Sequence, residues 1–340
     1  MVDTTGPTRN PVIDIAKGIA ILLVLVGHAI QFASGDSYQQ AGLFYDNLLF
    51  KVIYMFHMPL FMVISGYLFY NTVQKKSVKR IVLDKCRQLL LPIFSFALVV
   101  WLFKFHPEYS FFDQIRNYLS VTRFTLWFLW ALLYSSLGVL IGNKLFRDNI
   151  WIWAVLILAS FFTPDKWYSE MYKFLFPCFL FGYYAHKHDL VTMLKDNLPV
   201  VAIVSGVLFI ACVFLYSTET YVYLSGCNVL RDGVFVPRQL GIDIFRIVVG
   251  LLGTVLFVSL LLLLYTVVQP DGKVSKSLGS IGVCSMGIYC FQDYLFNYIG
   301  IGSLLHNRLL RFVAVFAVSF GLTLAVKRVK ILNMIFLGGR

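Results

Sequence analysis

Long blocks of apolar residues recur along the whole chain, and they constrain its fold more than any other feature. A block of about 20 apolar residues is what a helix needs to cross a bilayer. Of the 340 residues, 59% are hydrophobic and only 14% are charged, whereas soluble domains carry about 25% charged residues. The sequence therefore predicts an all-α polytopic integral membrane protein and excludes a soluble enzyme.

A hydropathy window of about 19 residues separates about ten candidate transmembrane helices. These lie near residues 13–33, 48–70, 87–104, 124–142, 150–163, 172–185, 198–216, 242–268, 280–300 and 309–326. The fifth and sixth segments are short, so one of them is a candidate re-entrant segment, and the eighth is long enough to tilt. No internal repeat or long linker divides the sequence, so residues 1–340 are expected to form one membrane domain.

The net charge of +12 is explained by topology. If the N-terminus is cytoplasmic, the inside segments hold roughly twice as many lysines and arginines as the outside loops, as the positive-inside rule requires. We therefore expect both termini in the cytoplasm and a multi-pass location in the inner (plasma) membrane. No RNA-binding or zinc-finger signature accompanies the charge, so nucleic acid is not an expected partner.

The six cysteines include no C-x-x-C pair, and only Cys227 falls in an expected outside loop. Neither a disulfide framework nor a metal site is predicted from this spacing. That outside loop, about residues 217–241, also carries Tyr221, Tyr223 and two arginines. The mixture suits a polar, ring-shaped ligand, although aromatic residues are also common at membrane interfaces.

Ionisable side chains inside the membrane are costly and tend to be functional. Asp14, Lys17 and His28 lie on the first predicted helix. The 11 residues between Lys17 and His28 correspond to about three turns, so both side chains share one face, about 16 Å apart. Asp14 falls near the same stripe.

Polar residues on two other predicted helices reach a similar depth. His57 lies on the second helix, where Pro59 predicts a kink, and Gln292 lies on the ninth. Each side chain fits either a functional site or an ordinary interhelical hydrogen bond. Asp243 and Arg246, three residues apart near the outer end of the eighth helix, fit either a local ion pair or a contact to a substrate hydroxyl.

Histidine chemistry is the reaction type that these residues favour. A neutral imidazole accepts a proton near pH 7 and can carry an acyl group transiently. The sequence contains no carboxylate dyad, GxSxG elbow, phosphate-binding glycine loop or H-E-x-x-H site. Acyl transfer centred on histidine therefore fits better than glycoside cleavage, serine hydrolysis or zinc chemistry.

Two segments resemble signatures of the integral-membrane acyltransferase-3 family. Asp14 to His28 is similar to its first-helix motif, and Phe56 to Tyr67 is similar to its second-helix motif. Further similar stretches are Lys79 to Pro92, Leu126 to Leu132, Phe179 to Gly182 and Leu278 to Tyr289. The resemblance extends over nearly the whole chain and implies about ten helices, an acyl-CoA donor and acetylation of cell-surface sugars.

By this resemblance, His28 is the catalytic histidine. Many members have arginine where this sequence has Lys17, which resembles the fucose 4-O-acetylase-like branch. Lysine keeps the positive charge but loses the bidentate fork of arginine. The family's ninth-helix motif often ends in histidine, where this sequence has Gln292, so proton transfer at that position is not carried over.

The sequence is interpreted as an acyltransferase that moves an acetyl group from acetyl-CoA, a co-substrate and not a bound cofactor, to a hydroxyl of a sugar or glycan. His28 and Lys17 are the expected catalytic residues, and Asp14, His57, Gln292, Asp243 and Arg246 are substrate-binding or supporting candidates. Lys79, Arg80, Lys85 and Arg87 are candidates for the donor phosphates, although the positive-inside rule explains them equally well. Two alternatives stay open, namely a transporter or flippase of a lipid-linked sugar, and an inactive scaffold or sensor.

Overall fold

The computed structural model describes residues 10–34, 44–105, 107–146, 149–267, 272–297 and 307–339, which are almost entirely helical. The first half contains α1 (Pro11–Ser34), α2 (Leu48–Lys75), α3 (Val78–Lys85), η1 (Cys86–Leu90), α4 (Leu91–Phe103), α5 (Phe111–Phe124), α6 (Trp127–Phe146) and α7 (Ile150–Ser160). The second half contains α8 (Ser169–Lys187), α9 (Leu190–Asp196), α10 (Leu198–Leu215), η2 (Thr218–Thr220), α11 (Val222–Ser225), β1 (Leu230–Arg231), β2 (Val234–Phe235), α12 (Pro237–Val267), α13 (Lys273–Val283), α14 (Ser285–Asn297), α16 (Arg308–Arg328) and α17 (Lys330–Leu337).

Within the described residues, each of the ten apolar segments expected from the sequence overlaps a helix; residue 268 and residues 298–300 of those segments lie outside the described part of the chain. Among the described residues, seven helical stretches are long and apolar enough to cross a bilayer. They are Pro11–Ser34, Leu48–Lys75, Val78–Phe103, Trp127–Phe146, Leu198–Leu215, Pro237–Tyr265 and Arg308–Arg328. The protein is an all-helical, polytopic membrane protein, as predicted.

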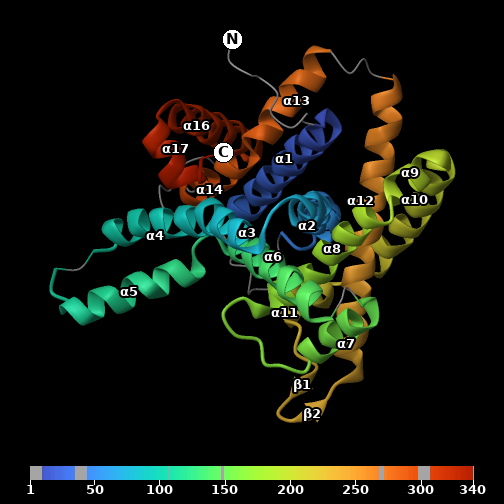
Figure 1. Cartoon of the computed structure of the whole chain (residues 1–340), viewed down its shortest axis with the longest axis horizontal. Coiled ribbons are helices and arrows are strands. Elements are labelled where there is room, and N and C mark those ends of the chain that lie inside the picture. The colour runs from blue at the N-terminus through green and yellow to red at the C-terminus, as the bar shows by residue number, and fades with distance from the viewer. Residues whose placement is uncertain are drawn as a thin grey trace.

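Most predicted boundaries shift by several residues, and two features of the structure were not expected. The segment expected as one helix over 280–300 is divided between α13 and α14, because the backbone turns at Cys284, whose N–H bonds to the carbonyls of Ser280 and Ile281. The amphipathic helix α5 was not predicted. Phe111 and Phe112 on α5 are 74% and 80% exposed. Helix α5 packs against α4, and the two project from one side of the bundle, where α4 also contacts α17 (Figure 1).

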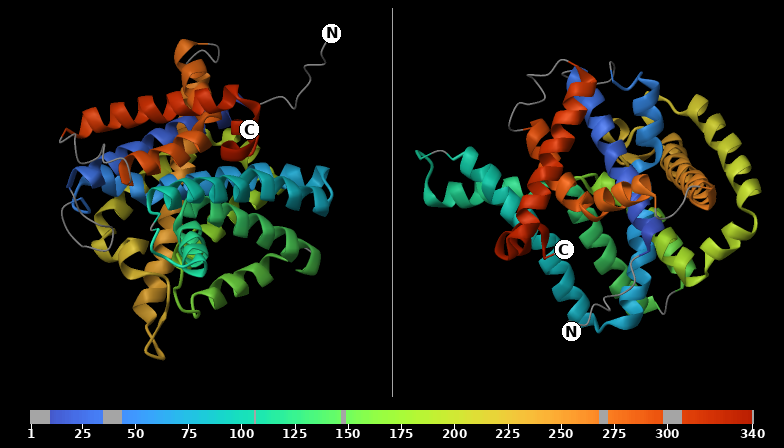
Figure 2. Two further views of the ribbon diagram at one scale, coloured as in Figure 1. Left: turned by 90° about the vertical axis from the view of Figure 1, so that its left-hand side faces the viewer. Right: turned by 90° about the horizontal axis from the view of Figure 1, so that it is seen from above.

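Helix α2 lies at the centre of the packing. It contacts α8 extensively and also packs against α12 and α1, while α1 packs closely against α13 and α14 packs against α16. Figure 2 shows the same neighbours from two further directions. The polar N-cap Asn47 begins α2 by accepting a hydrogen bond from the Phe50 amide at 3.0 Å, as a capping asparagine does.

Glycines permit the two closest helix pairings. A Cβ atom on Gly18 would lie 2.1 Å from the Leu278 carbonyl oxygen, and one on Gly282 would lie 1.7 Å from that of Asp14. Gly66 of α2 and Gly182 of α8 meet their partner backbones in the same way. Small residues let membrane helices approach closely, so these contacts fix α1 against α13, and α2 against α8.

Candidate active site

His28 of α1 and Gln292 of α14 face each other. The Nδ1 atom of His28 lies 2.8 Å from the Oε1 atom of Gln292, and Gln292 is fully buried. Two phenylalanine rings enclose the imidazole, since Phe32 and Phe296 each meet its ring edge to face at centroid distances of 6.1 and 5.8 Å. The structure thus brings together two polar residues that the sequence placed only at similar depth.

This contact determines which nitrogen of His28 is available for chemistry. An amide oxygen can only accept a hydrogen bond, so Nδ1 carries the proton and Nε2 keeps its lone pair. The Nε2 atom of Gln292 has no hydrogen-bond partner among the described residues. The arrangement gives a neutral imidazole with one nitrogen fixed and the other free to accept a proton.

His57 of α2 is held in the same tautomer by a different partner. Its Nδ1 atom donates to the Ile53 carbonyl oxygen at 2.8 Å, which leaves Nε2 as the accepting nitrogen. The Tyr54 ring lies 4.7 Å from the His57 ring, and Gly27, the residue before His28, packs against that tyrosine. His57 is therefore a near neighbour of the His28 region.

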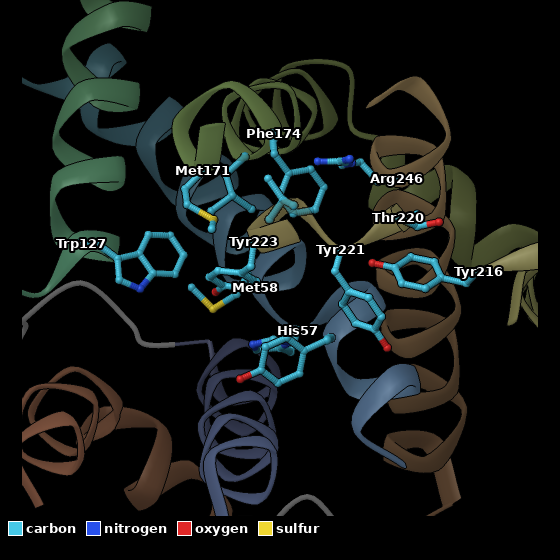
Figure 3. A pocket seen from close by; sticks show the side chains of 13 residues that line it. His57, Met58, Trp127, Met171, Phe174, Tyr216, Thr220, Tyr221, Tyr223 and Arg246 are labelled. Carbon is cyan, nitrogen blue, oxygen red and sulfur yellow. The ribbon is translucent and has the colours of Figure 1, made fainter. Parts of the chain in front are cut away.

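His57 lines an enclosed cavity, here called the tyrosine cavity. Its other described lining residues are Tyr54, Met58, Trp127, Met171, Phe174, Leu175, Tyr216, Thr220, Tyr221, Val222, Tyr223 and Arg246. Figure 3 shows Trp127 and Met171 on one side, with Tyr216 and Thr220 on the other. The cavity volume of about 20 Å³ is enough for one water molecule. Burial raises the pKa values of the Tyr221 and Tyr223 phenols, so both act as neutral hydroxyl groups.

Arg246 and Asp243 on α12 form part of a buried network above this cavity. Arg246 Nη2 lies 3.4 Å from Asp243 Oδ1. Arg246 Nη1 donates to the Gly226 carbonyl at 2.8 Å, and Nη2 donates to Ser225 Oγ at 2.5 Å. The ion pair that the sequence allowed is therefore present, and Arg246 also anchors the loop that supplies the tyrosines.

A second side chain, Asp165, holds the same loop. Asp165 Oδ2 accepts hydrogen bonds from the amides of Cys227 and Asn228 at 2.7 and 2.9 Å. Its other oxygen is paired with Lys173 at 2.8 Å. We call these contacts, from Asp165 and Arg246 to residues 225–228, the loop clamp.

Lys17 lies toward the N-terminal end of α1, whereas His28 lies toward its C-terminal end. Its Nζ atom pairs with Asp14 Oδ1 at 2.6 Å, so Asp14 is engaged with Lys17. Lys17 also lines a second cavity of about 100 Å³, here called the Lys17 cavity, together with Ile21, Val24, Met58, Phe61, Ser65, Phe128, Leu129, Leu132, Ser285, Met286 and Tyr289. Met58 lines both this cavity and the tyrosine cavity, so one side chain separates them.

The four basic residues predicted to contact the donor phosphates lie on α3 and η1, outside the lining of the two cavities. Arg80 pairs with Asp84 at 3.3 Å, and Lys85 sits over the Phe69 ring at 4.7 Å. Lys79 and Arg87 are exposed. Neither of the two cavities includes any of these four among its described lining residues.

The sequence did not single out several residues that shape the site. Phe32 and Phe296 enclose His28, and the Tyr289 hydroxyl accepts a hydrogen bond from the Phe128 amide at 3.3 Å. Tyr289 precedes Gln292 by three residues on one helix, and this spacing is the signal that could have identified it. Leu126, the first residue of the stretch Leu126 to Leu132, has a φ of 50°, a left-handed conformation that was not predicted from the sequence.

No group of three or more His, Cys, Asp or Glu residues that could hold a metal ion is present among the residues searched. Besides tyrosines, the titratable side chains among the described lining residues are His57 and Arg246 in the tyrosine cavity and Lys17 in the Lys17 cavity.

Comparison with known proteins places the chain among acyltransferases. Residues 10–328 match the acyltransferase-3 family, described as an acyltransferase domain. Nodulation protein NolL of Mesorhizobium japonicum is 34% identical over 179 residues, which cover 52% of this chain and 47% of NolL. Nodulation protein NolL of Sinorhizobium fredii is 39% identical over 132 residues, which cover 38% of this chain and 35% of NolL. The matches thus span half or less of these curated relatives, and no solved structure matches.

Proposed function

Because the chain belongs to the acyltransferase-3 family of acyltransferases, we propose that it transfers an acetyl group from acetyl-CoA to a hydroxyl of a sugar or glycan. The observation that carries this proposal is the contact between His28 and Gln292. It leaves the Nε2 atom of His28 free to accept a proton, which is the group that such a transfer requires.

The reaction needs only one proton to move. His28 Nε2 takes the proton of the acceptor hydroxyl while that oxygen attacks the thioester carbonyl. The carbon–sulfur bond then breaks, and the protonated imidazole returns the proton to the leaving thiolate. The products are the acetyl ester and free coenzyme A. The same nitrogen also suits a transient acyl-histidine, in which His28 carries the acetyl group between donor and acceptor.

The donor is proposed to approach from the cytoplasmic end of α1. Lys17 lies about 16 Å from His28 along the helix, and the Lys17 cavity follows the face that Ile21 and Val24 continue toward His28. Its positive charge and polar neighbours suit the amide-bearing arm of the donor. The basic residues Lys79, Arg80, Lys85 and Arg87 add to the positive field that attracts the anionic donor.

The acceptor is proposed to bind toward the tyrosine cavity. The rings of tyrosine and tryptophan, with the tyrosine hydroxyl and the indole N–H as polar groups, suit the alternating apolar and polar faces of a sugar. Tyr221, Tyr223 and Trp127 supply such rings, and His57 and Arg246 supply polar atoms. The tyrosine cavity, as the structure shows it, has room for one water molecule. Binding of a sugar there therefore requires the loop that carries the tyrosines to move outward.

The proposed setting is the inner (plasma) membrane, with both termini cytoplasmic and the loop at residues 217–241 outside. This orientation follows the bias of lysine and arginine along the sequence. It brings the donor from the cytoplasm and a cell-surface glycan from the other side. The partners are then acetyl-CoA, the glycan and the lipid bilayer.

Mass spectrometry of cell-surface glycans tests the proposal. Glycans from cells that produce the protein should carry acetyl esters that are absent from cells producing folded His28→Asn protein. His188→Ala, at an exposed histidine, is the matched control and should retain acetylation. Identical glycans from cells with and without the protein, or full acetylation with the His28 variant, would overturn the proposal.

A further inference from the structure

A third space, larger than the two cavities of the active site, opens beside the start of α1. This groove has a volume of about 520 Å³ and runs between α1, α13 and the end of α16. Asp14, Ser275, Lys276, Ser280 and Lys327 supply its polar lining. Such a volume is of the size that small-molecule sites have.

The groove carries a net positive charge. Lys276 is exposed, and Lys327 is half-buried with its Nζ atom donating to the Val283 carbonyl at 3.1 Å. The only acidic side chain among the described lining residues is Asp14, which Lys17 neutralises at 2.6 Å. Two lysines with no opposing free carboxylate favour an anionic ligand.

The groove also has open space beside Gly279 of α13. A Cβ atom added to Gly279 would meet nothing within 4 Å. Ser275 and Ser280 of the same helix both line the groove. A polar ligand placed there meets hydrogen-bonding groups as well as positive charge.

The groove adjoins the Lys17 cavity at two points. Asp14 lines the groove, and its partner Lys17 lines the cavity. Cys284 lines the groove and the next residue, Ser285, lines the cavity. The turn of the backbone between α13 and α14 therefore separates two spaces that follow one another toward His28.

We propose that this groove binds the phosphate-bearing nucleotide end of the acyl-CoA donor, with Lys276 and Lys327 pairing with its phosphates. This inference rests on the proposed function and assigns the phosphate contacts to residues outside the basic segment around Lys79. The thioester end then extends past the Asp14–Lys17 pair into the Lys17 cavity. Lysine suits this task because it binds phosphate as a point charge.

Donors of different length test the proposal. The protein is purified in nanodiscs, and KM is measured for acetyl-CoA and for the acetyl thioester of N-acetylcysteamine, which lacks all phosphates. Lys276→Gln and Lys327→Gln should each raise KM for acetyl-CoA by about three- to tenfold, and neither should change KM for the short thioester. Lys330→Gln, at an exposed lysine of α17, is the matched control and should change neither.

Three outcomes would overturn the inference. These are an unchanged KM for acetyl-CoA in the double variant, an equal rise for both donors, and a rise confined to Lys79→Gln. Calorimetric binding of free coenzyme A to His28→Asn protein needs no turnover, so loss of this binding in the double variant supports the groove even if acetyl transfer fails. Absence of transfer in the wild-type protein contradicts the proposed function instead.

A lipid headgroup is the other source of phosphate that reaches this side of the molecule. Nanodiscs made only of zwitterionic lipid, and nanodiscs containing anionic lipid, separate the two sources. Binding of coenzyme A should depend on both lysines in either lipid. The groove would be a lipid site if two results were obtained together. Anionic lipid would raise the unfolding temperature only when both lysines are present, and coenzyme A would bind equally well without them.

Discussion

The Nδ1 atom of His28 on α1 lies 2.8 Å from the Oε1 atom of Gln292 on α14, a residue 264 positions further along the sequence. The partner is an amide and not a carboxylate or a second histidine. Because an amide does not exchange protons near neutral pH, Gln292 orients the imidazole without taking part in proton transfer. The contact leaves a single proton-handling atom, Nε2, at the end of the polar stripe on α1.

Gln292 is the first residue to test. Gln292→Leu removes the acceptor for Nδ1 and should lower kcat about tenfold, the cost of one lost buried hydrogen bond. Gln292→His offers a ring nitrogen as acceptor and should retain most activity. The measurement is acetyl transfer by purified variants of equal thermal stability, and full activity of the leucine variant would leave Gln292 with a packing role only.

Replacement of His28 tests the chemistry directly. His28→Ala removes the free Nε2 atom, and loss of general-base action usually costs about 10²–10⁴ in rate. Release of coenzyme A from labelled acetyl-CoA is the readout, with unfolding followed in parallel. Near-normal turnover by a folded variant would show that another group takes the proton, and His57, which also keeps Nε2 as acceptor, would be the next candidate.

Lys17 is expected to act on donor binding more than on the chemical step. Lys17→Arg keeps the charge and should keep much of the activity, whereas Lys17→Ala should raise KM for acetyl-CoA about tenfold. Lys17→Ala also leaves Asp14 without its partner. The double variant Asp14→Asn with Lys17→Ala controls for that unpaired carboxylate, and a normal KM in this double variant would assign Lys17 a structural role alone.

Gly27 provides a test of the packing between His28 and His57. A Cβ atom there would lie 2.6 Å from Cε2 of Tyr54, so Gly27→Ala should destabilise the fold by about 1–3 kcal/mol and lower activity. Gly321→Ala, where a Cβ atom meets nothing within 4 Å, is the matched control. Thermal unfolding in nanodiscs measures both, and equal stability of the two variants would show that Tyr54 moves aside freely.

The orientation of the chain can be tested by cysteine labelling. Lys79→Cys and Asp232→Cys place thiols at exposed positions that the charge bias assigns to opposite sides of the membrane. A membrane-impermeant reagent should label position 232 in intact cells and position 79 only after permeabilisation, in a background without reactive native cysteines. Labelling of position 79 in intact cells would reverse the orientation.

The helices were the most predictable part of the fold, because apolar segments of membrane length leave few alternatives in lipid. The turn at Cys284 was not predictable, because a hydropathy window averages over about 19 residues and does not detect a change of backbone direction at a single residue. Helix α5 was missed for a related reason. With apolar residues on one face only, it falls below the threshold that marks a membrane span.

The candidate site was predictable in part. Helical periodicity placed Lys17 and His28 on one face of α1, and depth along the helices put Gln292 level with His28, but only the packing of α14 against α1 brings their atoms together. The loop clamp left no local signal. Asp165 reaches amides 62 and 63 residues further along the chain, a separation at which no sequence periodicity operates.

The loop clamp holds the loop mainly by its backbone, so the loop side chains can vary without loss of the main anchoring contacts. Asp165 and Arg246 hold residues 225–228 mainly through backbone amides and a carbonyl, groups that every amino acid except proline supplies. Tyr216, Tyr221 and Tyr223 precede this anchored segment and do not form the anchor. Under the proposed function, acceptor preference can therefore diversify by exchange of one short stretch of sequence while α1 and α14 remain unaltered. Under the same proposal, this stretch is the unit to graft between relatives to change the acceptor.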